Sequence, residues 1–430
     1  MKHQHIKIIL IGLLLVIAIS ETSCKKDFSN PSAVQAANAF SSAQAMTGVA
    51  IGLQRLYTAG RASSLYKRVS LNGLLTNELI VLNQGNTAEY QLQLGSGSVD
   101  GTNTILGELW TTSNKIIFDA DNVINSAASL GDKSYASGLI GYATVFKALA
   151  LGDLAMFWEK VPASNGSQVS FVDRAEGFTK AITAIDIALA AITTTPISAA
   201  FLTNATAGID ITNTLHALKA RYALFLGNYS LALSEANLVT LTVTSTFNFS
   251  TVNLNPIFET STSTNNVYAI NGDTMGLPTA LKPDVADQRI PFYVTSSYAS
   301  KILGFSAAST TPWPIYLPGE IMLIKAEAYA RQTVPDLVNA LIELNKVVTK
   351  EPAADPFGLG AALPPVAPLT QAEILDLIYK NRCIELFMSG LKLEDMRRFA
   401  RPTTERKRNL LPYPFLERDN NSNTPPDPPF

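Results

Sequence analysis

Few side chains in this 430-residue chain are suited to catalysis. Of its 3 histidines, His3 and His5 lie in the N-terminal segment, which leaves only His216 further along. A Ser-His-Asp or Cys-His arrangement would have to use His216, and no G-x-S-x-G nucleophile motif is present. The same count excludes a histidine-rich zinc site. We therefore expect His216 to be a packed or surface histidine, and we expect no metal site.

Other reaction classes lack their sequence signals as well. The chain has no phosphate-binding loop and no dinucleotide fingerprint, so we expect no cofactor. A glycosidase needs only two carboxylates, and the 35 Asp and Glu residues are numerous enough, but no pattern pairs them. Cys383 lies within an amphipathic segment, which favours a small packed side chain over a nucleophile. We expect that the protein is not an enzyme.

Binding suits the available residue types better. Saccharides are held by aromatic rings that cover their apolar faces, while Asn, Asp, Gln and Arg bond to their hydroxyls. Such residues must lie in loops or at helix ends to be reached. Trp313, between Pro312 and Pro314, is not expected within a helix. The candidates are Tyr66, Asn77, Glu78, Asn83, Tyr90 and Trp313. For each of them the alternative is a role as a structural aromatic or as a surface polar group.

Overall charge argues against some partners. The net charge is −2 and only 16% of residues are charged, which gives no electrostatic footprint for nucleic acid. Hydrophobic residues make up 47% of the chain, enough for a sizeable core.

The N-terminus has the features of a secretion signal. Lys2 and Lys7 precede an apolar run over residues 8–19, which is too short to span a bilayer. Ser23-Cys24 then follows, a small residue before a lone cysteine. We expect residues 1–23 to be a lipoprotein signal peptide and Cys24 to be acylated, which would anchor the protein to a membrane. The alternative is an ordinary secretory signal with a chance cysteine.

Most of the chain has helical periodicity, so we predict a mostly α-helical fold. Small residues recur within residues 137–158, where they would allow close approach of another helix. The segments 212–226 and 229–239, separated by Gly227-Asn228, resemble a tetratricopeptide (TPR) helix pair. The predicted helices cover residues 33–59, 66–82, 110–124, 137–158, 174–192, 212–226, 229–239, 318–331 and 335–350.

One long segment breaks this periodicity. Thr, Ser, Asn, Pro and Gly dominate residues 241–309, and loops of such length are usually functional or disordered. We predict short strands near residues 267–270 and 292–294. A Pro-rich exposed stretch is expected at 351–369 and a solvated basic run at 401–409. The domain prediction is a single domain over 24–430, with N-terminal helices and loops (25–135), TPR-like helices (136–240), a loop-rich insertion (241–316) and C-terminal helices with a tail (317–430).

The stretch from Gln371 to Phe399 is the clearest amphipathic segment. Thr370 and Glu373 have the spacing of a capping box, which predicts the start of a helix. Gly390 interrupts the pattern, so we predict two helices. Arg382 and Glu385 are three residues apart, as are Asp395 and Arg398, which places each pair on one helical face.

The order of residues in this stretch resembles the C-terminal signature of the SusD/RagB family of nutrient-binding lipoproteins. The sequence departs from it at Asn381, Ser389 and Lys392, which would weaken a lattice of ion pairs. Residues 121–124, 320–328 and 411–414 are similar to other segments of the family, which follow one another in the same order along the chain. The signature residues are Arg382, Glu385, Leu386, Gly390, Lys392, Asp395, Met396 and Arg398.

The resemblance implies a fold and a function. The fold would consist of TPR-like helix pairs that support a loop-rich, irregular binding region. The protein would be a surface-exposed outer-membrane lipoprotein that captures an oligosaccharide and delivers it to a SusC-like TonB-dependent transporter. Two alternatives stay open: the same uptake role with peptide cargo, and a helical-repeat lipoprotein scaffold without a small-molecule ligand.

Overall fold

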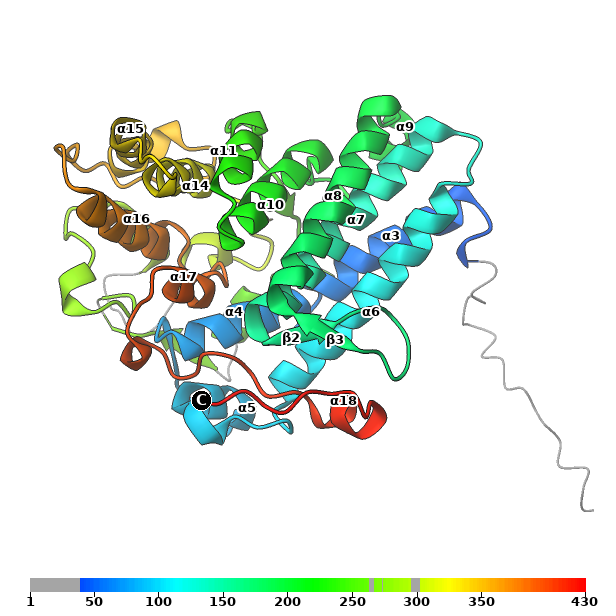
Figure 1. Cartoon of the computed structure of the whole chain (residues 1–430), viewed down its shortest axis with the longest axis horizontal. Helices are drawn as coiled ribbons and strands as arrows, with labels where there is room; N and C mark the ends of the chain where they lie inside the picture. The colour runs from blue at the N-terminus through cyan, green and yellow to red at the C-terminus, as the bar shows by residue number, and fades with distance from the viewer. Residues whose placement is uncertain (1–38, 263–266, 273, 295–301) are drawn as a thin grey trace, which may run out of the picture. The chain divides into compact units, whose positions relative to one another are not determined.

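Helices make up most of the fold, as the periodicity predicted (Figure 1). The computed structural model describes residues 39–262, 267–272, 274–294 and 302–430. The chain divides into two units, Met1–Ala39 and Phe40–Phe430, and the elements described belong to the second. The predicted signal peptide and Cys24 lie outside the described residues.

The helices and strands have the following bounds in chain order. The first half holds α3 (Ala43–Thr58), α4 (Ser64–Leu75), β1 (Leu79–Val81), α5 (Thr87–Leu94), α6 (Thr104–Ala127), α7 (Lys133–Phe157), β2 (Lys160–Pro162), β3 (Phe171–Asp173), α8 (Arg174–Thr194), α9 (Ala199–Asn204) and α10 (Ile211–Phe225). The second half holds α11 (Tyr229–Leu238), β4 (Thr246–Phe247), α12 (Pro256–Thr262), β5 (Tyr268–Ile270), α13 (Arg289–Tyr293), β6 (Trp313–Pro314), α14 (Pro318–Arg331), α15 (Leu337–Val348), α16 (Gln371–Glu385), α17 (Lys392–Arg398) and α18 (Phe415–Asn420).

The long helix α7 lies at the centre of the main hydrophobic cluster. Its glycines permit close packing, since a Cβ at Gly152 would collide with the Tyr222 hydroxyl of α10, and one at Gly141 would lie 2.7 Å from Ile211. The predicted close approach through small residues is therefore confirmed. Within the part of the chain that the structure describes, two helices, α7 and α8, are long and apolar enough to cross a membrane, but 89% of the most apolar window of α7 is buried within the fold. Helix α7 is thus a core helix.

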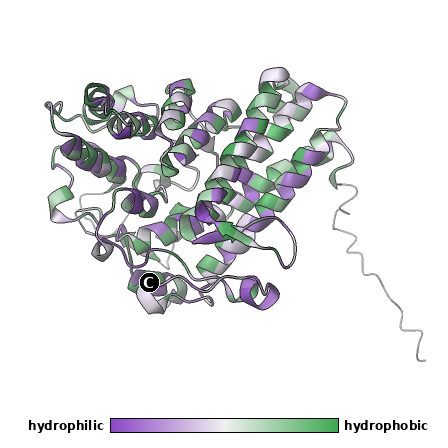
Figure 2. Cartoon of the chain, viewed as in Figure 1, coloured by the Kyte–Doolittle hydropathy of each residue, from purple (hydrophilic) through white to green (hydrophobic). Residues whose placement is uncertain are grey.

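The helix pairs stack one after another, as expected of TPR-like units. Helix α8 packs on α7 and α10, α11 packs on α10 and α14, and α14 packs on α15 and α16. Figure 1 shows this run from α7 and α8 through α10 and α11 to α14 and α15. Polar and apolar residues alternate along these helices in Figure 2, because each buries one face against its neighbours.

Among the described residues there are three small antiparallel sheets: β1–β5 joins the loop-rich insertion (241–316) to the chain between α4 and α5, β4–β6 pairs the two ends of that insertion, and β2–β3 lies outside it. Strand β1 pairs with β5 (Leu79 opposite Ile270), β2 with β3 (Val161 opposite Val172), and β4 with β6 (Phe247 opposite Trp313). The predicted strand at 267–270 is confirmed as β5. The strand predicted at 292–294 is wrong for Phe292 and Tyr293, which end the short helix α13; only Val294 forms an isolated antiparallel bridge, with Ile302. Helix α13 begins where the Asp287 side chain accepts the Arg289 N–H.

Other boundaries differ from the predictions for identifiable reasons. The helix predicted over 66–82 ends at Leu75, because Asn77 has a positive φ of 63° and the chain then enters β1. Helices α5, α9 and α18 were not predicted, nor were α12 and α13, which lie within the segment 241–309 that was expected to lack helices. The basic run 401–409 is only partly solvated, since the Arg408 side chain is buried and donates to the carbonyls of Ser96, Val99, Leu410 and Pro428.

The C-terminal helices form as predicted. The capping box of α16 is present, with Thr370 N–H donating to Glu373 at 2.9 Å, and Gly390 separates α16 from α17. The Asp395–Arg398 pair is confirmed at 2.6 Å. Arg382 and Glu385, however, do not pair with each other: Arg382 bonds to Asp395, while Glu385 bonds to Lys350 and Arg289.

Candidate binding sites

Helix α4 positions the two most promising regions of the molecule. Every residue of this helix is buried, and the Ser63 side chain caps its first turn by accepting the Tyr66 N–H. Tyr66 contacts α5, whereas Arg68 lines a pocket formed with α14 and the loop-rich insertion (241–316). A helix buried on all sides is a rigid support for side chains that project from it.

The first region is a polar surface beside α5. The Arg61 guanidinium donates to Glu89 at 2.6 Å and to Asn86 at 2.9 Å. Below it, the buried Tyr66 hydroxyl donates to the same Glu89 oxygen at 2.7 Å, so Glu89 fixes both side chains. Glu89 is buried while the Arg61 side chain is 45% exposed, which leaves the guanidinium open to solvent on one side.

Two predicted residues belong to this surface. Asn83 is exposed and its side chain accepts the Gly85 N–H at 2.9 Å, which orders the loop before α5. Tyr90 is half-buried on α5, one residue after Glu89. We call Arg61, Asn83, Asn86 and Tyr90 the α5 surface; it offers a guanidinium, two amides and a phenol, which suit sugar hydroxyls and an apolar sugar face.

Asn77 and Glu78 lie at a different junction, between α4 and β1. The Asn77 side chain donates to the Glu405 carbonyl at 3.0 Å. Glu78 is buried and accepts from Asn72 at 3.0 Å. Burial raises the pKa of Glu78 to about 7, although the nearby Lys392 ammonium opposes the shift. In this conformation both residues join parts of the fold, and Glu78 is not open to solvent.

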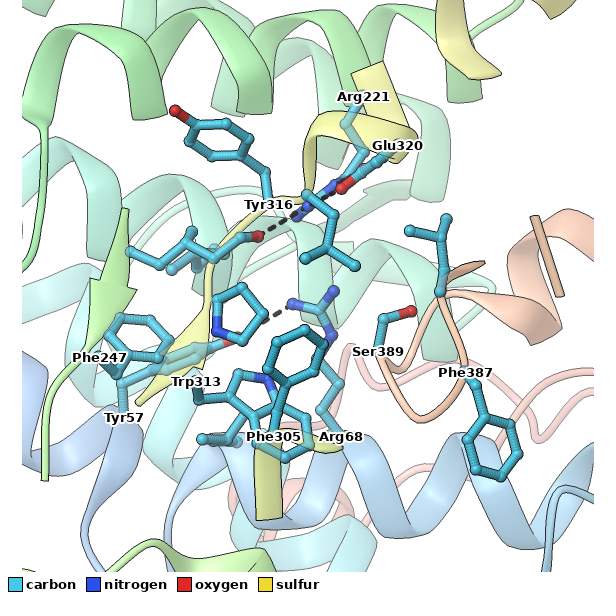
Figure 3. A pocket seen from close by; sticks show the side chains of 16 residues that line it. Tyr57, Arg68, Arg221, Phe247, Phe305, Trp313, Tyr316, Glu320, Phe387 and Ser389 are labelled. Carbon is cyan, nitrogen blue, oxygen red and sulfur yellow. Dashed lines mark hydrogen bonds and ion pairs between the residues drawn. The ribbon is translucent and has the colours of Figure 1, made fainter. Parts of the chain in front are cut away.

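The second region is the pocket in Figure 3, to which Trp313 contributes. Trp313 is 6% exposed and meets Phe305 at a centroid distance of 6.3 Å. The guanidinium groups of Arg68 and Arg221 and the Ser389 hydroxyl also line the pocket. Its free volume of about 30 Å³ holds about two water molecules, so a sugar ring does not fit.

A wider cleft lies between α6, α7, α8 and the β2–β3 hairpin. Its volume of about 510 Å³ lies in the range of small-molecule sites. Its floor is aliphatic, and its rim carries Lys147, which pairs with Asp121 at 2.5 Å, and Lys180, which donates to the Ala163 carbonyl. None of the described residues that line it is aromatic, so they provide no stacking platform for sugars.

Reactive groups occupy structural positions. Burial raises the pKa of the Cys383 thiol to about 12, which keeps it protonated and unreactive. His216 Nδ1 lies 2.7 Å from a Glu235 carboxylate oxygen and joins α10 to α11. Among the described residues, no group of three or more His, Cys, Asp or Glu side chains is arranged to hold a metal ion.

Comparison with known proteins identifies the architecture. No family model and no curated protein matches the sequence. A SusD superfamily protein from Bacteroides thetaiotaomicron VPI-5482 superimposes with a TM-score of 0.70 at 15% identity, covering 90% of this chain and 100% of the other. This chain has the SusD-like fold.

Two other solved structures with the SusD-like fold are described by their ligands. A SusD-like carbohydrate-binding protein from Bacteroides fragilis NCTC 9343 matches with a TM-score of 0.62 and 13% identity, over 84% of this chain and 87% of that one. A laminarin-binding SusD-like protein matches with a TM-score of 0.60 and 14% identity, over 90% of this chain and 99% of the other. The fold expected from the sequence resemblance is therefore confirmed.

The residues that carried the resemblance hold the SusD-like fold together. Asp395 accepts from both Arg382 and Arg398, and Arg398 reaches Glu327 of α14 at 2.6 Å. Two of the three departures keep polar contacts: Asn381 accepts from Arg289 at 2.9 Å and Lys392 lies 3.4 Å from the Gly276 carbonyl. The hydroxyl of the third, Ser389, has no hydrogen-bond partner among the described residues. The signature residues thus stabilise the packing of α14, α16 and α17.

Sequence reasoning missed Arg61, Asn86, Arg68 and Arg221. Asn86 shares the residue type and loop position of Asn83, so the same criterion would have found it. The two buried arginines gave no sequence signal, because their roles depend on contacts between elements far apart in the chain: Arg68 of α4 with Asp153 of α7, and Arg221 of α10 with Glu320 of α14.

Proposed function

We propose that this protein is a cell-surface lipoprotein that captures an oligosaccharide and delivers it to a SusC-like TonB-dependent outer-membrane transporter. The observation that carries the proposal is the SusD-like fold over nine-tenths of the chain, shared with proteins described as carbohydrate-binding. The protein acts by binding, and no bond in the cargo is made or broken. Peptide cargo is the alternative within the same role.

The α5 surface is the proposed contact site for the cargo. Its guanidinium and amide groups are held in place by Glu89 and by the loop before α5, so little side-chain freedom is lost on binding. Tyr90 supplies the ring face, and Asn83 bonds to sugar hydroxyls. Tyr66 supports this surface from below through Glu89. The proposed contact site does not include Asn77, which bonds to the Glu405 carbonyl, or the buried Glu78 and Trp313.

A binding screen tests the cargo class. The soluble protein from Lys25 onward is titrated by calorimetry with a panel of glycans and, separately, with a panel of peptides. We expect saturable binding to at least one glycan. Binding to peptides alone would replace the saccharide proposal by the peptide alternative. No binding in either panel would favour a helical-repeat lipoprotein scaffold without a small-molecule ligand.

The membrane anchor is tested separately. Acylation of Cys24 would keep the protein in the membrane fraction of the producing cell. We expect the wild-type protein to incorporate a labelled fatty acid and the Cys24→Ala protein to lose both the label and the membrane association. A labelled Cys24→Ala protein would contradict the proposed anchor.

A further inference from the structure

Three residues that line the small cavity beside Trp313 each have a buried hydrogen-bond donor without a partner. Arg68 Nε, Arg221 Nη1 and Ser389 Oγ are buried and have no hydrogen-bond partner among the described residues. All three residues line the same cavity of about 30 Å³ (Figure 3). The side chains of Arg68 and Arg221 are 7% and 2% exposed, so bulk water does not satisfy these donors. A buried donor without a partner is costly to the folded state, and more so when it is charged.

The remaining groups of both arginines are fixed. Arg221 donates to both Glu320 oxygens, at 2.6 and 2.8 Å, and to the Ile315 carbonyl at 2.8 Å. Arg68 donates to the Tyr57 hydroxyl at 3.2 Å, and its Nη1 lies 3.5 Å from Asp153. Neither guanidinium can rotate to satisfy its free N–H without breaking these contacts.

Position 390 has room for the Arg68 side chain only because its residue is glycine. A Cβ there would lie 2.5 Å from Arg68 Cγ and 2.7 Å from Nε. Gly390 has a positive φ of 80°, so the turn between α16 and α17 both admits Arg68 and carries Ser389 to the cavity. The donor set is thus assembled from α4, α10 and the α16–α17 turn.

The rest of the wall determines what the cavity accepts. Leu65, Leu149, Phe305, Trp313 and Leu386 contribute apolar surface. Two polar lining residues have acceptor oxygens that are already engaged: both Glu320 oxygens accept from Arg221, and the Tyr57 hydroxyl accepts from Arg68. A water molecule that accepted from both arginines would need acceptors for its own two protons. A small anion accepts from every donor and donates nothing, and hydrogen bonds from a guanidinium to an anion are charge-assisted. The carboxylates of Glu320 and Asp153, which lie beside Arg221 and Arg68, offset part of the positive charge.

We propose that this cavity binds one small monovalent anion, of halide or formate size, between Arg68, Arg221 and Ser389. The anion would join α4, α10 and the α16–α17 turn in the folded protein. This site is independent of the α5 surface and of the cargo that the α5 surface takes.

Anomalous diffraction from crystals of the mature protein grown in sodium bromide tests the site directly. We expect a bromide peak in the cavity, within hydrogen-bond distance of at least one of the two guanidinium groups. Bromide peaks only on the outer surface, or none, would overturn the proposal. So would ordinary density for water in the cavity of the same crystals.

A charge insertion provides a test in solution. In Ser389→Asp, a carboxylate from the protein itself would reach the anion position, so the thermal midpoint should rise relative to wild type in sodium gluconate, whose anion is too large for the cavity. The wild-type midpoint should rise on exchange of gluconate for formate at equal ionic strength, and this shift should be lost in Ser389→Asp. Equal formate shifts in both proteins would contradict the proposal.

Ser113→Asp is the matched control. Ser113 is also fully buried with an unpartnered hydroxyl, but it lies on α6 and does not line the cavity. We expect Ser113→Asp to lower the thermal midpoint and to keep the formate shift. If Ser389→Asp lowers the midpoint as much as Ser113→Asp does, the donors at the cavity do not hold an anion.

Discussion

Arg382 of α16 and Asp395 of α17 form a buried ion pair across the Gly390 break, with Nε 2.8 Å from Oδ2. Asp395 also accepts from Arg398, which continues to Glu327 of α14. Burial alone would raise the pKa of Asp395, but the two arginines outweigh it and hold the pKa below its ordinary value. The carboxylate therefore locks three helices together in its ionised form.

Asp395→Asn should destabilise the protein by about 3–5 kcal/mol, because it leaves the buried Arg382 guanidinium without its counter-charge. Denaturant unfolding measures the change. Asp119→Asn, which breaks the exposed Lys115–Asp119 pair on α6, is the matched control and should stay within about 0.5 kcal/mol of wild type. Equal effects of the two substitutions would show that the Asp395 network adds nothing beyond a surface pair.

Gly319 near the start of α14 leaves room for a second buried carboxylate. A Cβ there would overlap the carboxylate of Glu385, which is held by Lys350 at 2.6 Å and Arg289 at 3.1 Å. Gly319→Ala should cost about 1–3 kcal/mol of unfolding free energy through this collision. Gly107→Ala in α6 meets nothing within 4 Å and should instead stabilise by about 0.4–1 kcal/mol. The same sign for both substitutions would refute the packing argument.

How far the sequence predicts the fold depends on whether a boundary is set locally. Helix α14 begins at Pro318 as predicted, and α16 begins after its Thr370 capping box, because these signals act within one helical turn. The end of α4 could not be predicted, since the backbone at Asn77 packs against Gly276, far along the chain. The candidate residues show the same limit: Tyr66 and Glu78 have the right types, but only the structure reveals that they are buried.

Arg408 shows how one member of a charged run differs from its neighbours. Its side chain donates to four carbonyl groups, whereas the next residue back, Lys407, is exposed. Arg408→Ala should lower the unfolding free energy by about 3 kcal/mol, because buried carbonyls lose a charged donor. Lys407→Ala removes the same charge and should change it by less than about 0.5 kcal/mol. A small effect of Arg408→Ala would mean that the C-terminal segment is held by other contacts.

Glu78 makes stability depend on pH. Burial raises its pKa to about 7 in the folded protein, above the ordinary 4.5, so the folded state binds the proton more tightly than the unfolded state. Its contribution is fully present below pH 4.5 and is lost as pH rises to about 7. Glu78→Gln keeps the shape of the side chain without its charge. The unfolding free energy of the variant, relative to that of wild type, should therefore increase by about 1–3 kcal/mol as pH rises from 4.5 to 7.5. A pH-independent difference would place the Glu78 pKa near its ordinary value.

The most direct test of saccharide capture is a pair of calorimetric titrations with a glycan that binds the wild-type protein. Tyr90→Ala removes the proposed ring face, and binding should weaken about tenfold or more, in line with about 1–3 kcal/mol for one aromatic contact. Phe118→Ala removes another accessible aromatic side chain, 53% exposed on α6, and should leave the dissociation constant unchanged. If Tyr90→Ala binds the glycan as tightly as wild type does, the α5 surface is not the site of capture.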